Sequence, residues 1–179
     1  MKRASSIGLA ALVASTALAI SVQIPLSRFE QMKKLDSYVG TWKIKGKILL
    51  PTEFSGETFQ GDLTISRALG NTALEFKAKS KFDHSNVRAL EASGILAYND
   101  ADTYSKHCFR SSFAWNQDGR MLPLRGNFKD KTLILEGSPD GSEKLDLRVK
   151  ASGESTKTID VFVVDGKDER LFIQLTLEK

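Results

Sequence analysis

The stretch LDSYVGTWKIKGKILL, residues 35–50, decides the fold because apolar and polar side chains alternate along it after a glycine. Trp42, Ile44 and Ile48 fall on one side of an extended chain, and three lysines fall on the other. An alternation with a period of two residues is typical of a β-strand that has one buried face and one wet face. The stretch therefore predicts a strand whose tryptophan points into an apolar core.

The same alternation recurs along most of the chain. It is clearest at residues 74–82, 144–151 and 171–177, where an apolar side chain occupies nearly every second position. Glycine-containing turn signals separate such runs. They lie at residues 70–71, 118–119, 139–141 and 165–166.

Consecutive antiparallel strands that each carry one apolar face need a way to bury that face. Closure into a barrel buries all these faces together and removes both edge strands. We therefore expect an all-β protein, an up-and-down antiparallel barrel of about ten strands. A two-sheet sandwich is the alternative, but its crossing connections would need longer loops than these hairpin turns provide.

The first residues differ from the strands that follow. Lys2 and Arg3 precede an apolar run over residues 7–22, in which a small-residue stretch ends at Ala19. This pattern predicts a signal peptide over residues 1–19, cleaved near Ala19, and hence a periplasmic or secreted protein without a membrane span after cleavage. An uncleaved anchor is the alternative, but the run is short for a bilayer.

The mature chain then divides into an N-terminal segment, residues 20–37, and a barrel domain, residues 38–179. In the segment, Ser27 and Glu30 have the spacing of a capping box and follow Pro25. This arrangement predicts one short helix before the first strand.

Charge and cysteine content exclude some classes of protein. The net charge is +4 at pH 7, and Lys2 and Arg3 contribute two of these charges, so an exported form is close to neutral. Lysines and acids are interspersed and form no basic block, which argues against a nucleic-acid partner. The single cysteine, Cys108, cannot form an internal disulfide, so the core must stabilise the fold.

The motif Gly40-Thr41-Trp42, after a short helix and before a run of strands, resembles the start of lipocalin-like barrels of the calycin superfamily. The middle of the chain resembles a bacterial lipocalin-like family of unknown function, related in shape to the nitrobindins. The likeness covers about residues 35–177 of the chain. Its glycine-bearing strand, aromatic turn and following glycine turn correspond to Gly94, Tyr98, Asn99, Asp100, Tyr104, Asp118 and Gly119.

This resemblance implies a structural role for Trp42. In lipocalins, the equivalent indole lies at the closed end of the barrel under an arginine from the last strand, so Gly40, Trp42 and Arg170 would plug the barrel here. Nitrobindins bind haem through a histidine on a late strand, and no histidine follows His107 in this sequence. We therefore expect no haem, and neither histidine has the spacing of a metal site.

Candidate ligand contacts come from the strand-like residues 105–115. Alternation there places His107, Phe109 and Phe113 on one aromatic-rich face, which we expect to line the barrel. Inside, an imidazole could hydrogen-bond a bound molecule, although a core histidine satisfied by a neighbour is the alternative. The candidate ligand-binding residues are Phe76, Tyr98, His107, Phe109, Phe113 and Phe128.

Three functions fit these expectations. The favoured one is binding of a small apolar or aromatic molecule with one polar group inside the barrel. A filled barrel could instead act through its surface as an envelope partner or homodimer, because residues 161–164 are apolar on both faces. A calycin-type isomerase would need His107 to converge with Tyr98 or Tyr104, and we find no motif for a catalytic nucleophile.

Overall fold

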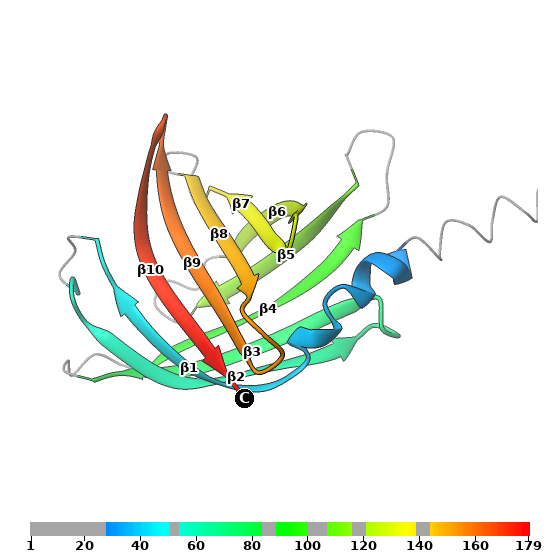
Figure 1. Ribbon diagram of the computed structural model, residues 1–179, viewed down its shortest axis with the longest axis horizontal. Coiled ribbons are helices and arrows are strands. Elements are labelled where there is room, and N and C mark those ends of the chain that lie inside the picture. Colours follow the sequence, from blue (N-terminus) through cyan, green and yellow to red (C-terminus); the bar gives the residue numbers. More distant parts are fainter. Residues whose placement is uncertain (1–27, 51–53, 84–88, 100–106, 116–120, 139–143) are drawn as a thin grey trace, which may run out of the picture.

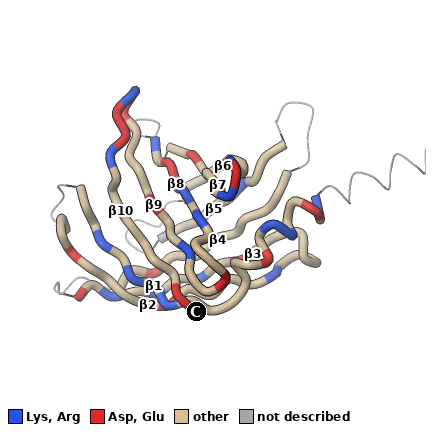
Figure 2. Tube along the Cα trace, in the orientation of Figure 1, with Lys and Arg blue, Asp and Glu red and all other residues tan. Residues whose placement is uncertain are grey.

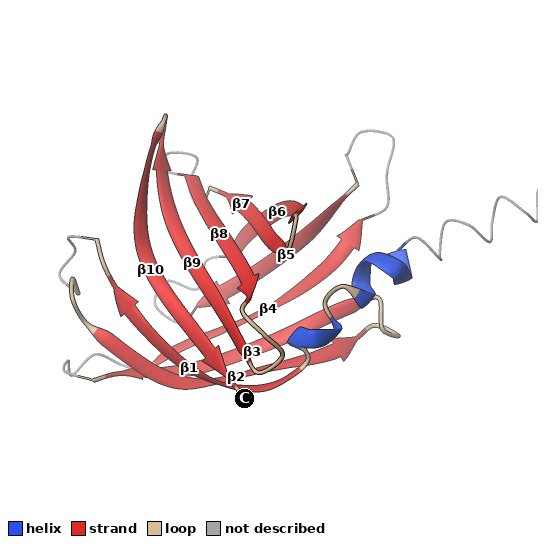
Figure 3. Ribbon diagram, in the orientation of Figure 1, coloured by secondary structure: helices blue, strands red, loops and turns tan. Residues whose placement is uncertain are grey.

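The computed structural model of the protein describes residues 28–50, 54–83, 89–99, 107–115, 121–138 and 144–179. These residues form a closed antiparallel barrel of ten strands, preceded by a short helix (Figure 1, Figure 3). Each strand pairs with its neighbours in sequence, and β1 pairs with β10 to close the wall. The expected all-β up-and-down barrel is confirmed, and the two-sheet sandwich is excluded.

The strand bounds follow the alternation in the sequence. The strands are β1 (Gly40–Ile48), β2 (Thr58–Ala68), β3 (Ala73–Phe82), β4 (Leu90–Asn99), β5 (Cys108–Trp115), β6 (Met121–Lys129), β7 (Thr132–Gly137), β8 (Lys144–Ala151), β9 (Thr156–Asp165) and β10 (Asp168–Glu178).

The two ends of the barrel are built differently. The helix end contains the start of β1, the β2–β3 turn and the end of β10, and the far end contains the β9–β10 turn. At the closure, Ile44 lies opposite Leu177 and Lys43 lies opposite Glu178. Buried and exposed positions alternate along β1, which places its apolar face inside the barrel.

The predicted helix spans residues 28–33 and is followed by the 3-10 helix η1 (Asp36–Tyr38). Met32 and Leu35 are each 1% exposed and pack into the cluster that fills the helix end. Phe29 is exposed, so it does not share this packing. The segment therefore covers one mouth of the barrel.

Arg67 on β2 holds this segment in place. Its Nη2 donates to the carbonyl oxygen of Met32 at 3.3 Å, and its guanidinium forms an ion pair with the Asp36 carboxylate. A charge-assisted contact of this kind fixes geometry as well as adding stability.

The β2–β3 turn confirms the signal at residues 70–71. Leu69, Gly70 and Asn71 all have positive φ, at 49°, 63° and 69°. The Oγ1 of Thr72 donates to the carbonyl oxygen of Leu69 at 2.7 Å, which closes the turn. Glycine and asparagine tolerate this backbone conformation best, so the sequence suits the turn except at Leu69.

Some expectations fall on residues that the structure does not describe. They are the signal peptide with its cleavage site, the capping residue Ser27, and the turns at residues 118–119 and 139–141. Within the described part of the chain, no helix has the length and apolar character needed to cross a bilayer.

Candidate ligand-binding cavity

An apolar cavity of about 230 Å³ lies inside the barrel. Leu35 and Tyr38 line it at the helix end, and the strands contribute inward-facing aliphatic residues and phenylalanines. Tyr38 and Ser111 carry the only hydroxyl groups among the described lining residues, none of which is charged. Such a lining favours a neutral apolar guest.

Phe76 and Phe113 are the two candidate residues that line this cavity. Their ring centroids are 6.3 Å apart, with β4 between their strands. Gly94 is opposite both residues, and a Cβ there would lie 2.5 Å from Phe76 Cζ and 2.6 Å from Phe113 Cβ. The glycine thus leaves the space in which the two rings approach each other.

Tyr98, Phe109 and Phe128 form a separate aromatic group nearer the helix end. The Phe109 ring makes edge-to-face contacts with Tyr98 at 5.1 Å and with Phe128 at 5.5 Å between centroids. The three residues belong to the core cluster around Met32 and Leu35 and do not line the cavity. Their position indicates a packing role, with aromatic pairs in a favourable geometry.

His107 does not point into the barrel, contrary to the expectation from alternation. It is exposed and precedes β5, which begins at Cys108, so the alternating pattern ends before it. Its carbonyl oxygen accepts a hydrogen bond from Asn127 Nδ2 at 2.9 Å. Ser111 is the polar residue of β5 that lines the cavity instead, and Cys108 is buried.

The isomerase hypothesis loses its geometric basis with His107. The imidazole is outside, Tyr98 packs in the aromatic group, and Tyr104 lies outside the described residues. Among the residues described, no three histidine, cysteine, aspartate or glutamate side chains cluster as a metal site would require.

Trp42 is fully buried at the helix end. Its Nε1 donates to the carbonyl oxygen of Tyr38 at 2.8 Å, which ties β1 to η1. Two lysines lie over the indole, with Nζ of Lys179 4.6 Å and Nζ of Lys157 5.6 Å from the ring centroid. The tryptophan therefore lies under two lysines and not under the arginine that the resemblance implies.

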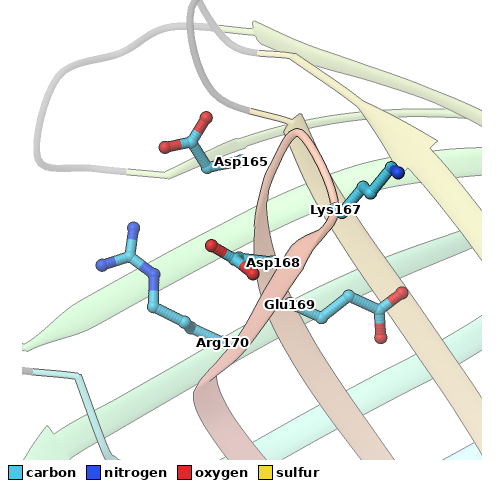
Figure 4. Close-up of a pocket in the computed structure, with 5 residues that line it drawn as sticks. All are labelled: Asp165, Lys167, Asp168, Glu169 and Arg170. Carbon is cyan, nitrogen blue, oxygen red and sulfur yellow. The ribbon is translucent and has the colours of Figure 1, made fainter.

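Arg170 is not one of these cations, and its predicted place over Trp42 is wrong. The last residues of β10 lie near Trp42, whereas Arg170 is near the start of the strand. Arg170 therefore lies opposite Val163, near the far end of the barrel. Arg170 is exposed, and Figure 4 shows it beside the β9–β10 turn. Gly40 does lie at the helix end, where a Cβ would be 3.1 Å from Cε of Lys179.

Lys157 is a buried charged residue that was not predicted from the sequence. It is 1% exposed, and its Nζ donates to the carbonyl oxygen of Gly153 at 2.6 Å. Burial lowers the pKa of Lys157, and the charge of Lys179 lowers it further, whereas Glu154 raises it. Alternation offered a signal, because Lys157 lies on the same face of β9 as Ile159, opposite the buried Leu177.

The carboxylates of the β9–β10 turn do not form a catalytic pair. Figure 4 shows Asp165 and Asp168 on one side of the hairpin and Glu169 on the other. The Glu169 carboxylate accepts a hydrogen bond from Nη2 of Arg148 at 2.7 Å. This arrangement is a solvated hairpin tip with one ion pair.

The outward apolar patch expected on β9 is partly covered. The guanidinium carbon of Arg148 lies 4.2 Å from the centroid of the Phe162 ring. A register shift between Leu171 and Ile173 on β10 changes the alternation, and Phe172 packs against the buried cluster around Trp42. The patch is therefore smaller than the sequence indicates.

Comparisons with known proteins show the fold. No protein-family model and no curated protein matches this sequence. The solved S-type phycobiliprotein lyase CPES from Guillardia theta is 10% identical, with a TM-score of 0.53 over 82% of this chain and 89% of the lyase chain. The redesigned β-barrel mFAP0 bound to DFHBI is 14% identical, with a TM-score of 0.42 over 80% of this chain and 100% of that chain. At this identity, the likeness to the lyase shows a shared lipocalin-like barrel architecture.

Proposed function

We propose that this protein is an exported lipocalin-like barrel of the calycin type that binds a small, neutral, apolar molecule in its interior. The observation that carries the proposal is the 230 Å³ cavity and its uncharged lining. The interior of a small closed barrel is either filled by side chains or holds one small ligand, and the cavity here leaves space for a ligand.

The size and chemistry of the cavity restrict the guest. Its volume is below the about 300–1,000 Å³ typical of small-molecule pockets, which favours a compact molecule. A charged group would lose its hydration without gaining a charged partner. We expected the ligand to carry one polar group that His107 would bind. Among the described lining residues, only the hydroxyl groups of Ser111 and Tyr38 could bind such a group, so the ligand is mainly hydrocarbon.

The export part of the proposal rests on the N-terminal sequence. Lys2, Arg3 and the apolar run over residues 7–22 have the pattern of a cleavable signal. N-terminal sequencing of the protein from a periplasmic or culture-medium fraction should begin near residue 20. An intact N-terminus in a membrane fraction would contradict export with cleavage.

Native mass spectrometry of the protein purified from its own host tests the binding proposal first. We expect a retained mass that disappears on denaturation and belongs to a neutral apolar compound. A matched pair of probes then tests the cavity: naphthalene should bind, and naphthalenesulfonate, which adds a charge to the same rings, should not.

Two leucine substitutions locate the binding site. Ala78 lines the cavity, so Ala78→Leu should fill it and abolish naphthalene binding. Ala114 faces outward on β5, next to the inward Phe113, so Ala114→Leu should bind naphthalene as the natural protein does. Equal binding by both variants would refute the interior site.

A further inference from the structure

A groove of about 650 Å³ lies on the outer face of the barrel over β4, β5 and β6. Two arginines, Arg110 and Arg125, and one carboxylate, Glu136, line the groove together with Ser112, and Ile95 and Pro123 contribute apolar side chains. Phe109 and Leu124 on the same strands are buried inside the wall, so the alternating arginines point outward. The groove therefore lies on the opposite face of the wall from the interior cavity, and Ser111 and Leu124 border both spaces.

Arg110 and Arg125 lie directly opposite each other on β5 and β6. The Cβ atoms of opposite residues in an antiparallel pair are about 4.5–5.5 Å apart, and like charges in this position repel each other. Two arginines here thus violate a local rule of sheet stability. Such violations are expected at functional sites, where another requirement outweighs stability.

Among the described residues, no carboxylate forms an ion pair with Arg110 or Arg125, although Glu136 lines the same groove. Glu136 lies opposite Arg125, but its carboxylate forms an ion pair with Lys144 Nζ at 2.9 Å. Several cations elsewhere on the outer wall do form ion pairs with acidic partners, as Lys43 does with Asp62 and Lys79 does with Glu91. Figure 2 shows this interspersed pattern of basic and acidic residues along the strands.

Two guanidinium groups that lie opposite each other favour a phosphate monoester over a carboxylate as the bound anion. One guanidinium fork satisfies the two oxygens of a carboxylate, whereas a phosphate monoester has three terminal oxygens and can accept bonds from both forks. Ile95 is 37% exposed beside the arginines, and Pro123 adds further apolar surface. An apolar chain attached to the phosphate would cover these side chains.

We infer that this groove binds the phosphate of an anionic amphiphile, with Arg110 and Arg125 on the phosphate and the apolar part against Ile95 and Pro123. The site lies outside the wall and does not depend on an interior ligand. It gives the protein a second binding surface, one for a phosphate-bearing lipid.

Flotation with lipid vesicles tests the inference on the purified protein. It should bind vesicles of phosphatidylcholine that contain phosphatidic acid and should not bind phosphatidylcholine alone. The double variant Arg110→Gln/Arg125→Gln should bind at least about tenfold more weakly, because each arginine contributes charge-assisted bonds. Equal binding by the variant, or no binding by the unaltered protein, would overturn the inference.

A matched variant separates a site from general charge. Lys43→Gln/Lys45→Gln also removes two cations from the outer wall, on β1, and should leave vesicle binding nearly unchanged. An equal loss in this variant would reduce the effect to net charge and overturn the site. Circular dichroism should confirm that both double variants are folded, as expected for exposed positions.

Two further measurements test how the groove holds its ligand. Arg110→Lys/Arg125→Lys keeps both positive charges but removes the paired N–H donors of the guanidinium groups, so it should weaken vesicle binding several-fold. Unchanged binding would contradict bidentate contacts from both arginines. Inorganic phosphate should bind more weakly than phosphatidic acid. Equal affinities would show that the apolar contacts contribute nothing, and would overturn the assignment to an amphiphile.

Discussion

Trp42 combines two interactions that its sequence motif alone does not show. Its ring lies beneath two lysines, and its indole nitrogen bonds to the backbone of Tyr38. The resemblance located the tryptophan but suggested the wrong cation, because β10 brings Lys179, not Arg170, to this end. The Gly-x-Trp motif identifies Trp42 in the first strand. Which cation lies over its ring depends on which end of β10 is next to it, and the motif does not contain that information.

The hydrogen bond from Trp42 gives a prediction about stability. Trp42→Phe keeps an aromatic ring but leaves the Tyr38 carbonyl oxygen without this donor. We expect the free energy of unfolding to fall by about 1–3 kcal/mol, measured by urea denaturation. No change would mean that water replaces the indole nitrogen at this position.

Lys157 gives a prediction about pH. Burial lowers its pKa in the folded protein below the ordinary value of 10.5, so the unfolded chain binds more protons between these two values. The free energy of unfolding should therefore rise with pH in that interval. Burial raises the pKa of Tyr38, which opposes this trend only above that tyrosine's ordinary value of 10.0.

The measurement compares the natural protein with Lys157→Met from neutral pH to pH 10. Methionine keeps the buried stem without a titratable group. We expect the free energy of unfolding to increase with pH more steeply in the natural protein than in the variant. Parallel curves would contradict a lowered pKa at Lys157.

At the scale of the elements, alternation predicted the strands well because each has one face against the core. It failed where a strand ends or shifts register. His107 precedes the first residue of β5, and the alternation expected over residues 171–177 is interrupted by the register shift between Leu171 and Ile173 in β10. A period of two holds only while both neighbouring strands keep the chain extended, and the sequence does not mark where that pairing stops.

The β2–β3 turn supplies a prediction at this scale. Leu69 has φ of 49° and is 71% exposed, an unfavourable combination for a leucine. Leu69→Asn should raise the free energy of unfolding by about 0.5–1 kcal/mol, because asparagine tolerates the left-handed conformation. Leu49→Asn is the control, since Leu49 is exposed without a positive φ, and it should give no such gain in thermal or denaturant melts.

For the whole molecule, the sequence predicted the barrel because ten consecutive strands, each with one apolar face, have few other ways to bury those faces. It could not predict whether the interior is filled. The cavity depends on the summed volumes of side chains from every strand and from the N-terminal segment. Single residues such as Phe76 and Phe113 could be assigned to the interior, but the space between them could not.

The cavity leads to opposite effects on stability and binding. Ala78→Leu adds buried carbon atoms, so we expect the free energy of unfolding of the ligand-free protein to rise by about 1–2 kcal/mol. The same variant should lose naphthalene binding. Lower stability with unaltered binding would show that residue 78 does not border an empty interior.

The closure between β1 and β10 has a consequence for folding. It joins residues as far apart as Lys45 and Glu178, which are separated by 133 positions. Bringing such distant segments together is entropically costly, whereas each hairpin forms locally. We expect the β1–β10 pairing to form last during folding and to open first during unfolding. When it is open, β1 and β10 are two unpaired edge strands. A second copy in the same state offers the complementary edges, so strand exchange at this pairing is the expected route to aggregation at high concentration.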